Sequence, residues 1–314
     1  MNIIGPDYLV FAIDDLAVGA QFLSDYGLAD QGDGLFTALD GTGIIIRQSD
    51  DPRLPAWPLP TTNQLRKTIY GVADQATLDA IAAELSRDRE VKRLPDGSIE
   101  AVDDTHFVLG FQVTVRRPLD MPGELVNAPG APQRGFNVSG IDWNLPAAVP
   151  KPRSLSHVVY FVPDYKKTEA FYIDRLGFRL VDRFEGMGPF LRPAGCIEHH
   201  TMFLIQTPPH LQGCEHFTFH MGGPTEVLLA GQNLVRKGYE SFWGPGRHRF
   251  GSNWFWYFNS PFGAHIEYDA DMDVHDDSWE PRIEQAQADR SQIFLFHWRD
   301  TWAPGGPPPP GKAG

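Results

Sequence analysis

Residues 244–269 of this 314-residue chain read GPGRHRFGSNWFWYFNSPFGAHIEYD. The stretch opens with a glycine-rich segment, predicted as a loop, that carries Arg247 and His248. Residues 253–258 are rich in aromatics, which favour a pleated, half-buried surface, and the Pro-Phe-Gly that follows is typical of a turn between two strands. In the second strand, period-two alternation places Glu267 on one face. A carboxylate on a strand otherwise built for burial needs a partner, and the candidate partners are histidines on earlier strands.

Composition restricts the possible functions. The net charge of −13 and the pI near 5.2 argue against nucleic-acid binding, because phosphate binding needs a basic face. We find no secretory leader pattern and no apolar run of the roughly 20 residues that span a bilayer, so we expect no membrane partner and a cytoplasmic protein. Cys196 and Cys214 do not form a disulfide framework, and we expect reduced thiols.

The chain repeats one pattern of strand, helix and three strands. Residues 8–28 align with residues 157–178 with one extra residue in the second helix, and Tyr8 then stands where His157 stands. The strand at 66–72 aligns likewise with the strand that opens the last unit. Four such units, paired into two halves, are the simplest account. Strands are predicted at 7–13, 66–72, 98–102, 105–115, 155–162, 178–184, 200–206, 215–220, 253–259 and 264–269, and helices at about 15–26, 74–87, 164–176 and 224–237.

Proline distribution suggests the domain boundaries. Seven prolines lie between residues 117 and 153, which indicates a linker or an extended crossover at 118–153. We therefore expect an N-terminal domain at 1–117 and a C-terminal domain at 154–275. A C-terminal extension at 276–314 would end in a Pro/Gly-rich tail that we expect to be disordered.

Three residues of the second half form a candidate metal site. Ten of the eleven histidines follow residue 150. His157 and His216 occupy matching positions in strands that open repeat units, and Glu267 lies on the last strand of the final unit. Two imidazoles and one carboxylate form a facial triad that leaves coordination positions open and suits non-haem Fe(II), whereas a structural zinc site would take four ligands, usually with thiolates. Any one of the three alone is more often an ordinary core residue; their repeated placement favours metal binding.

Five motifs of the second half fall into one family pattern, namely Ser156-His157-Val158-Val159, Glu198-His199-His200-Thr201, Glu215-His216-Phe217, Gly244-Pro245-Gly246-Arg247-His248, and Trp256-Tyr257 ahead of Gly263-Ala264-His265-Ile266-Glu267. With these motifs, residues 154–270 resemble the type I extradiol ring-cleaving dioxygenases of the vicinal oxygen chelate (glyoxalase/bleomycin resistance/dihydroxybiphenyl dioxygenase) superfamily. The resemblance implies an α+β fold in which four βαβββ modules pair into two vicinal oxygen chelate domains, each an open barrel-like mixed sheet. It also implies Fe(II), or less often Mn(II), held by His157, His216 and Glu267, and a first half without metal.

The resemblance also implies roles for other residues. His200 would be the acid-base group, with His199 as the alternative if the alignment shifts by one. His248 would contact a substrate hydroxyl, and Tyr257 would bond the opposite substrate oxygen. These roles are chemically reasonable, because a catechol must lose protons to chelate a metal and a histidine can accept or return one. Arg247 and Asn253, like His199, are candidate substrate contacts, although residues of this kind are also common in ordinary turns.

The hypothesis is an Fe(II)-dependent dioxygenase of the catechol 2,3-type that opens an aromatic ring next to its two hydroxyls and incorporates both atoms of O2. Such an enzyme would serve aromatic-hydrocarbon catabolism, and we expect a homo-oligomer. Two alternatives remain: a glyoxalase-type metal-dependent isomerase or transferase of the same superfamily, and a non-enzymatic protein that binds a small aromatic molecule.

Overall fold

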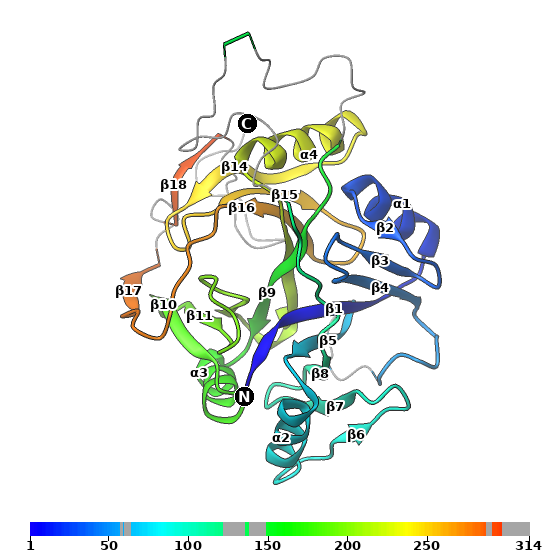
Figure 1. Cartoon of the computed structure of the whole chain (residues 1–314), viewed down its shortest axis with the longest axis vertical. Helices are drawn as coiled ribbons and strands as arrows, with labels where there is room; N and C mark the ends of the chain where they lie inside the picture. The colour runs from blue at the N-terminus through cyan, green and yellow to red at the C-terminus, as the bar shows by residue number, and fades with distance from the viewer. Residues whose placement is uncertain (57–58, 60–63, 122–135, 138–148, 287–290, 297–314) are drawn as a thin grey trace.

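A computed structural model describes residues 1–56, 59, 64–121, 136–137, 149–286 and 291–296. It shows two mixed sheets, each accompanied by helices, with β1 and β9 next to each other (Figure 1). The expected α+β class is confirmed, and within the described ranges neither sheet closes into a barrel. Most of the predicted linker and the Pro/Gly tail from residue 297 lie outside these ranges, so the predicted domain boundaries stay predictions. No described helix has the length and hydropathy to cross a membrane.

The first sheet has eight strands in the order β2-β3-β4-β1-β5-β8-β7-β6. Its elements are β1 (Ile3–Ile13), α1 (Leu16–Tyr26), β2 (Ala29–Asp30), β3 (Leu35–Thr37), β4 (Gly43–Gln48), β5 (Leu65–Val72), α2 (Gln75–Leu85), β6 (Lys92–Arg93), β7 (Ile99–Val102) and β8 (Val108–Val113). These elements form two consecutive βαβββ units, as the repeat predicts.

The second sheet repeats this order and extends it. Its ten strands run β17-β10-β11-β12-β9-β13-β16-β15-β14-β18, so the central eight follow the order of the first sheet and the last two strands of the chain add one edge each. Its elements are β9 (Ser154–Val162), α3 (Tyr165–Ala170), η1 (Phe171–Arg175), β10 (Arg179–Glu185), β11 (Gly188–Arg192), β12 (Met202–Gln206), η2 (Pro209–Leu211), β13 (Gly213–His220), α4 (Pro224–Arg236), β14 (Ser241–His248), β15 (Trp254–Asn259), β16 (His265–Ala270), β17 (Arg282–Gln285) and β18 (Gln292–Leu295).

Capping chemistry fixes the starts of three helices. Asp15, Asp74 and Asp164 each accept a hydrogen bond from a backbone N–H of the first turn, as N-cap carboxylates do. The third helix differs from the prediction of one α-helix over 164–176, because it continues after Ala170 as the π-helical turn η1. A π-turn accommodates one inserted residue, which matches the extra residue in this helix.

The prediction that a glycine-rich loop carries Arg247 and His248 is wrong, because both residues lie on strand β14, which pairs with β15. The pairing register shifts between Trp243 and Gly246, so Gly244 and Pro245 sit in a bulge of the strand. A bulge tolerates a proline that cannot donate to the ladder. Gly-Pro-Gly therefore marks an irregular strand here, and it places His248 beside the aromatic side chains of β15.

The two halves share one hydrophobic core. Phe11 of β1 packs against Phe217 of β13, with ring centroids 5.1 Å apart. Tyr26 at the end of α1 stacks on Tyr268 of β16 at 4.0 Å and donates a 2.5 Å hydrogen bond to the backbone carbonyl of Glu267. The first half therefore directly supports the strand that carries the candidate carboxylate ligand.

Candidate active site

His157, His216 and Glu267 come together on three neighbouring strands. β13 lies between β9 and β16, and the pairing of Thr218 with Glu267 brings the inward faces of these strands to one point. His157 Nε2 lies 3.2 Å and His216 Nε2 3.5 Å from Glu267 Oε2. One ligand atom from each of the three residues lies within 4.8 Å of the others, and all three side chains are buried.

The donor set fits a divalent transition metal. His216 Nε2 and Glu267 Oε1 are buried and have no hydrogen-bond partner among the described residues, which is costly unless something else satisfies them. Burial raises the pKa of Glu267, but the neighbouring imidazoles of His157, His248 and His216 outweigh it and hold that pKa well below its usual range. Burial lowers the pKa of His157, which favours the neutral imidazole that binds metals. An ionised carboxylate with two imidazoles suits Fe(II) or Mn(II).

A carboxylate stands behind the metal-facing side of His216. His216 Nδ1 is hydrogen-bonded to one carboxylate oxygen of Glu215. The other carboxylate oxygen of Glu215 lies 2.8 Å from His265 Nδ1. Because an ionised carboxylate can only accept, His216 donates through Nδ1, and its Nε2 faces Glu267. His265 thus holds the carboxylate that orients a candidate ligand.

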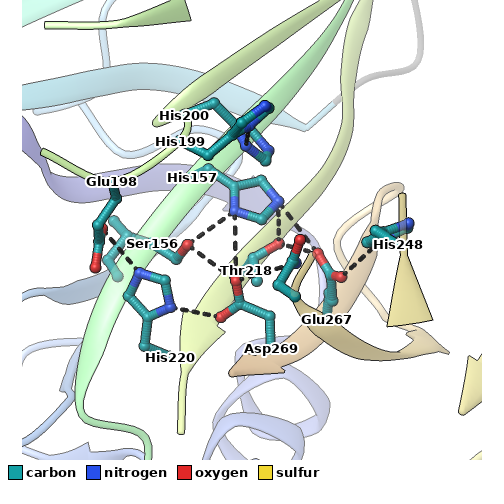
Figure 2. A network of polar contacts seen from close by, with 12 residues as sticks. Ser156, His157, Glu198, His199, His200, Thr218, His220, His248, Glu267 and Asp269 are labelled. Atoms are coloured by element: carbon teal, nitrogen blue, oxygen red, sulfur yellow. Dashed lines mark hydrogen bonds and ion pairs between the residues drawn. The ribbon is translucent and has the colours of Figure 1, made fainter. Parts of the chain in front are cut away.

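His157 is supported by a longer chain of polar contacts, which runs from Ser156 through Asp269 and His220 to Glu198 (Figure 2). Ser156 Oγ lies 2.8 Å from His157 Nδ1 and 3.3 Å from Asp269 Oδ2. Asp269 Oδ1 in turn lies 2.7 Å from His220 Nδ1, and His220 Nε2 lies 3.0 Å from Glu198 Oε2. Burial lowers the pKa of His220, but the carboxylates on either side raise it well above its usual value, so the ring is an imidazolium between two anions.

A cavity of about 180 Å³ opens in front of the candidate ligands. One part of its wall is polar and consists of His157, His200, His216, His248, Asn253, Tyr257 and Ser291. The rest is apolar and consists of Val159, Phe184, Met187, Phe190, Phe203, Trp243, Phe250 and Ala286. Since no Lys or Arg of the described ranges lines it, the cavity suits an uncharged aromatic molecule with a polar edge.

His200 and His199 occupy different environments. His200 lines the cavity, and its ring lies 4.3 Å from that of His157. Burial and the neighbouring histidines hold the pKa of His200 well below its usual value, so the ring is neutral. His199 does not line the cavity; it is fully buried and reaches Asp182 through Nε2 at 2.7 Å. The structure therefore puts His200, and not His199, within reach of a bound molecule.

The other predicted residues also differ in whether they line the cavity. His248 Nε2 lies 3.1 Å from the Tyr257 hydroxyl and 3.5 Å from Glu267 Oε1, and both side chains line the cavity. Asn253 also lines it and donates through Nδ2 to Asp269 at 3.4 Å. Arg247 does not, because its Nε donates to the Ser252 carbonyl at 2.7 Å.

The sequence assigns no role to six residues that the structure places around the site: Ser156, Asp182, Glu215, Thr218, His220 and Asp269. A signal existed for some of them. Ser156 and Glu215 immediately precede the two histidine ligands, and Asp269 follows Glu267 by two residues and so shares its strand face. Thr218, two residues after His216, donates to Glu267 Oε2 and lies 2.9 Å from His157 Nε2. Asp182 carries no local signal, because its partners are distant in sequence.

Comparison with known proteins agrees with this geometry. Residues 154–268 match the model of the Glyoxalase/Bleomycin resistance protein/Dioxygenase superfamily. Metapyrocatechase 2 of Cupriavidus necator is 36% identical over 153 residues, which are 48% of this chain and 45% of that protein, so the match spans less than half of this relative. Biphenyl-2,3-diol 1,2-dioxygenase of Paraburkholderia xenovorans is 27% identical over 293 residues, 89% of this chain and 91% of that protein.

A solved structure extends the likeness over the whole fold. The Mn(II)-bound glyoxalase from Novosphingobium aromaticivorans superposes with a TM-score of 0.70 at 19% identity, covering 93% of this chain and 90% of that one. The second half of the chain, residues 154–268, therefore resembles the glyoxalase/bleomycin resistance protein/dioxygenase superfamily. Its sequence relatives within that superfamily are extradiol dioxygenases, which confirms the resemblance read from the motifs.

Proposed function

We propose that this protein is an extradiol dioxygenase that opens the ring of a catechol next to its two hydroxyls and incorporates both atoms of O2. The observation that carries the proposal is the convergence of His157, His216 and Glu267 on one cavity that His200, His248 and Tyr257 also line. The sequence relatives named above support the same reaction class.

The proposed metal is Fe(II), with Mn(II) as the alternative, because the same two imidazoles and carboxylate accept both ions. When bound, the ion supplies a Lewis-acidic template for the diol and O2. Ser156 and Glu215 hold the ligand rings in place through their Nδ1 atoms. The apolar wall around Phe190 excludes water from the ring that is to be opened.

His200 is proposed as the acid-base group. Its ring is neutral and stands at the cavity wall beside His157, so it can take a proton from the bound diol and return it later. A positioned group of this kind contributes roughly 10²–10⁴-fold to rate.

His248 and Tyr257 are proposed to bond the substrate oxygens. Burial raises the pKa of Tyr257 well above its usual value, so its hydroxyl stays protonated and can donate. His248, 3.1 Å away, can donate or accept beside it. Asn253 offers a further contact, because its buried Oδ1 has no hydrogen-bond partner in the described part of the chain.

A test begins with anaerobic purification, loading with Fe(II) or Mn(II), and oxygen uptake on a panel of substituted catechols. We expect one ion per chain, catechol-dependent oxygen consumption and a yellow ring-opened product. A loaded protein that consumes no oxygen with any catechol would favour a glyoxalase-type isomerase. A protein that takes up no metal but binds small aromatic molecules tightly would favour a binding protein.

We also propose that the protein forms a homo-oligomer and that it is located in the cytoplasm. Ile283 and Ile293, on the two edge strands added by the C-terminal segment, are 62% and 61% exposed and offer an apolar contact surface. Analytical ultracentrifugation of the full chain would test the subunit number, and fractionation of the native host would test the location.

A further inference from the structure

Three buried side chains form a row that ends at the cavity. Asp182 Oδ2 lies 2.7 Å from His199 Nε2, and His199 Nδ1 lies 2.9 Å from His200 Nδ1. Asp182 and His199 are fully buried and His200 is 5% exposed. Only His200 lines the cavity, so the row runs from a carboxylate on β10 to the proposed acid-base group.

The hydrogen-bond chemistry allows one arrangement of protons along this row. Burial raises the pKa of Asp182, but hydrogen bonds from His199 and Arg282 outweigh it and leave the pKa lowered, so the carboxylate is ionised and can only accept. Burial lowers the pKa of His199, which is therefore neutral and carries its one proton on Nε2. His199 Nδ1 must then accept from His200 Nδ1–H, so Nε2 is the nitrogen of His200 that is left to take up a proton.

Neighbouring groups fix this row in place. Asp182 Oδ1 accepts from the backbone N–H of Arg282 at 2.9 Å and from its Nε at 3.1 Å, so the carboxylate cannot turn. Gly251 lies against the His199 ring: a Cβ there would stand 3.3 Å from Nδ1, and its φ of +80° is in the region that favours glycine. Both contacts hold His199 in the orientation that the proton arrangement requires.

We propose that Asp182 and His199 are positioning residues that set the tautomer of His200 and present its Nε2 lone pair to the substrate. The inference rests on the proposed function, because His200 is the acid-base group there. It assigns His199 a role behind the site instead of contact with substrate, and it gives Asp182 and Arg282 a part in the reaction.

Asp182→Asn tests the inference most sharply. The backbone N–H of Arg282 holds an acceptor at the Oδ1 position, and the exposed Arg282 side chain, which also donates to Oδ2, can turn toward solvent. The amide oxygen of the variant therefore occupies the Oδ1 position and its NH2 faces His199. His199 then carries its proton on Nδ1 and donates it to His200, which loses its Nε2 lone pair. With the metal-loaded full chain, we expect kcat to fall by about 10²–10⁴-fold, while KM for catechol and the metal content stay near wild type.

His199→Asn is the matched rescue variant. The Asn side-chain oxygen occupies nearly the place of Nδ1 and can accept from His200, so we expect kcat within about 10-fold of wild type, whereas His199→Leu, which cannot accept, should resemble Asp182→Asn. The double variant Asp182→Asn/His199→Asn should be no slower than His199→Asn alone, since the effect of Asp182 passes through His199.

The outcomes separate the two claims. If the wild type is active, either of two results overturns the positioning role and leaves the proposed function intact. In the first, the losses of kcat in the two single variants multiply in the double variant. In the second, kcat of Asp182→Asn is unchanged. If Asp182→Asn does not fold, His199→Asn and His199→Leu decide the question, and equal losses in both overturn the role. A metal-loaded wild type without catechol-dependent oxygen uptake overturns the proposed function and this inference with it.

Discussion

The two halves of the chain have the same strand order and carry different residues on it. In the second half, Ser156 and His157 lie on β9, and Asp7 and Tyr8 lie at the matching place on β1. β5 and β8 contain no His, Asp or Glu, whereas β13 and β16 supply His216 and Glu267. Among the described residues, one His-His-Glu group has metal-binding geometry, and it lies in the second half. The comparison shows that the fold provides converging strands, while a few inward positions decide whether chemistry follows.

The first half of the chain supports the second half structurally. Tyr26 bonds the backbone of Glu267, and Tyr268 donates back to the Tyr26 carbonyl at 2.7 Å. The shared core around Phe11 buries the side of the second sheet that faces away from the cavity. A half without candidate metal ligands therefore supports the half that has them.

The largest expected difference between the halves is in metal binding. His157→Ala should weaken metal binding by more than the roughly 10–100-fold that loss of an outer partner costs, because it removes a ligand itself. Tyr8→Ala, at the matching position, should leave the affinity unchanged. Metal titration under anaerobic conditions measures both, and similar losses in the two variants would contradict the assignment of the site to one half.

The next effect separates binding from chemistry within the second half. His200→Phe should keep metal and catechol binding and lower kcat by about 10²–10⁴-fold, because the phenyl ring fills the space of the imidazole while the proton acceptor is lost. Oxygen uptake gives kcat and KM separately. Unchanged turnover would rule out the proposed role of His200.

A pH effect is expected in the first half, away from the metal. Burial raises the pKa of Asp103 from 3.8 to about 6, more than its hydrogen bonds lower it. A raised folded-state pKa means that the stabilising contribution is complete below pH 3.8 and is lost as the pH rises through about 6. The stability of the wild type relative to Asp103→Asn should therefore fall by about 2 kcal/mol between pH 4 and pH 7. Urea unfolding at several pH values measures this difference, and a flat or rising difference would contradict it.

A smaller effect concerns the support of His157. Asp269→Asn removes the negative charge behind Ser156, and we expect metal affinity to fall by about 10–100-fold. Asp103→Asn is the matched control, since Asp103 is also buried but bonds Thr105 and Phe107 in the first half. Equal affinities in the two variants, after comparison of their melting temperatures, would show that Asp269 only stabilises the fold.

The smallest expected effect is at the contact between the halves. Tyr26→Phe keeps the stacking on Tyr268 and removes one hydrogen bond, so the free energy of unfolding should fall by about 0.5–1.5 kcal/mol. Metal stoichiometry should stay at the wild-type value. A loss of metal in this variant would show that the first half sets the site itself and does more than support it.

The sequence predicts those features that repeat or alternate locally. The matched positions of His157 and Tyr8 indicate both the doubling and the loss of ligands in one copy. β14 was missed because Gly244 and Pro245 are loop residues by propensity, and only pairing with β15 makes them part of a strand. Asp182 could not be found because its partners His199 and Arg282 are 17 and 100 residues away, and only the sheet brings them together.

The most direct test of the account is anomalous diffraction from crystals of the metal-loaded full chain, recorded on both sides of the iron and manganese edges. The account predicts one anomalous peak per chain, bound by His157, His216 and Glu267, and none between β1, β5 and β8. A peak in the first half, or a peak that does not touch Glu267, would contradict it.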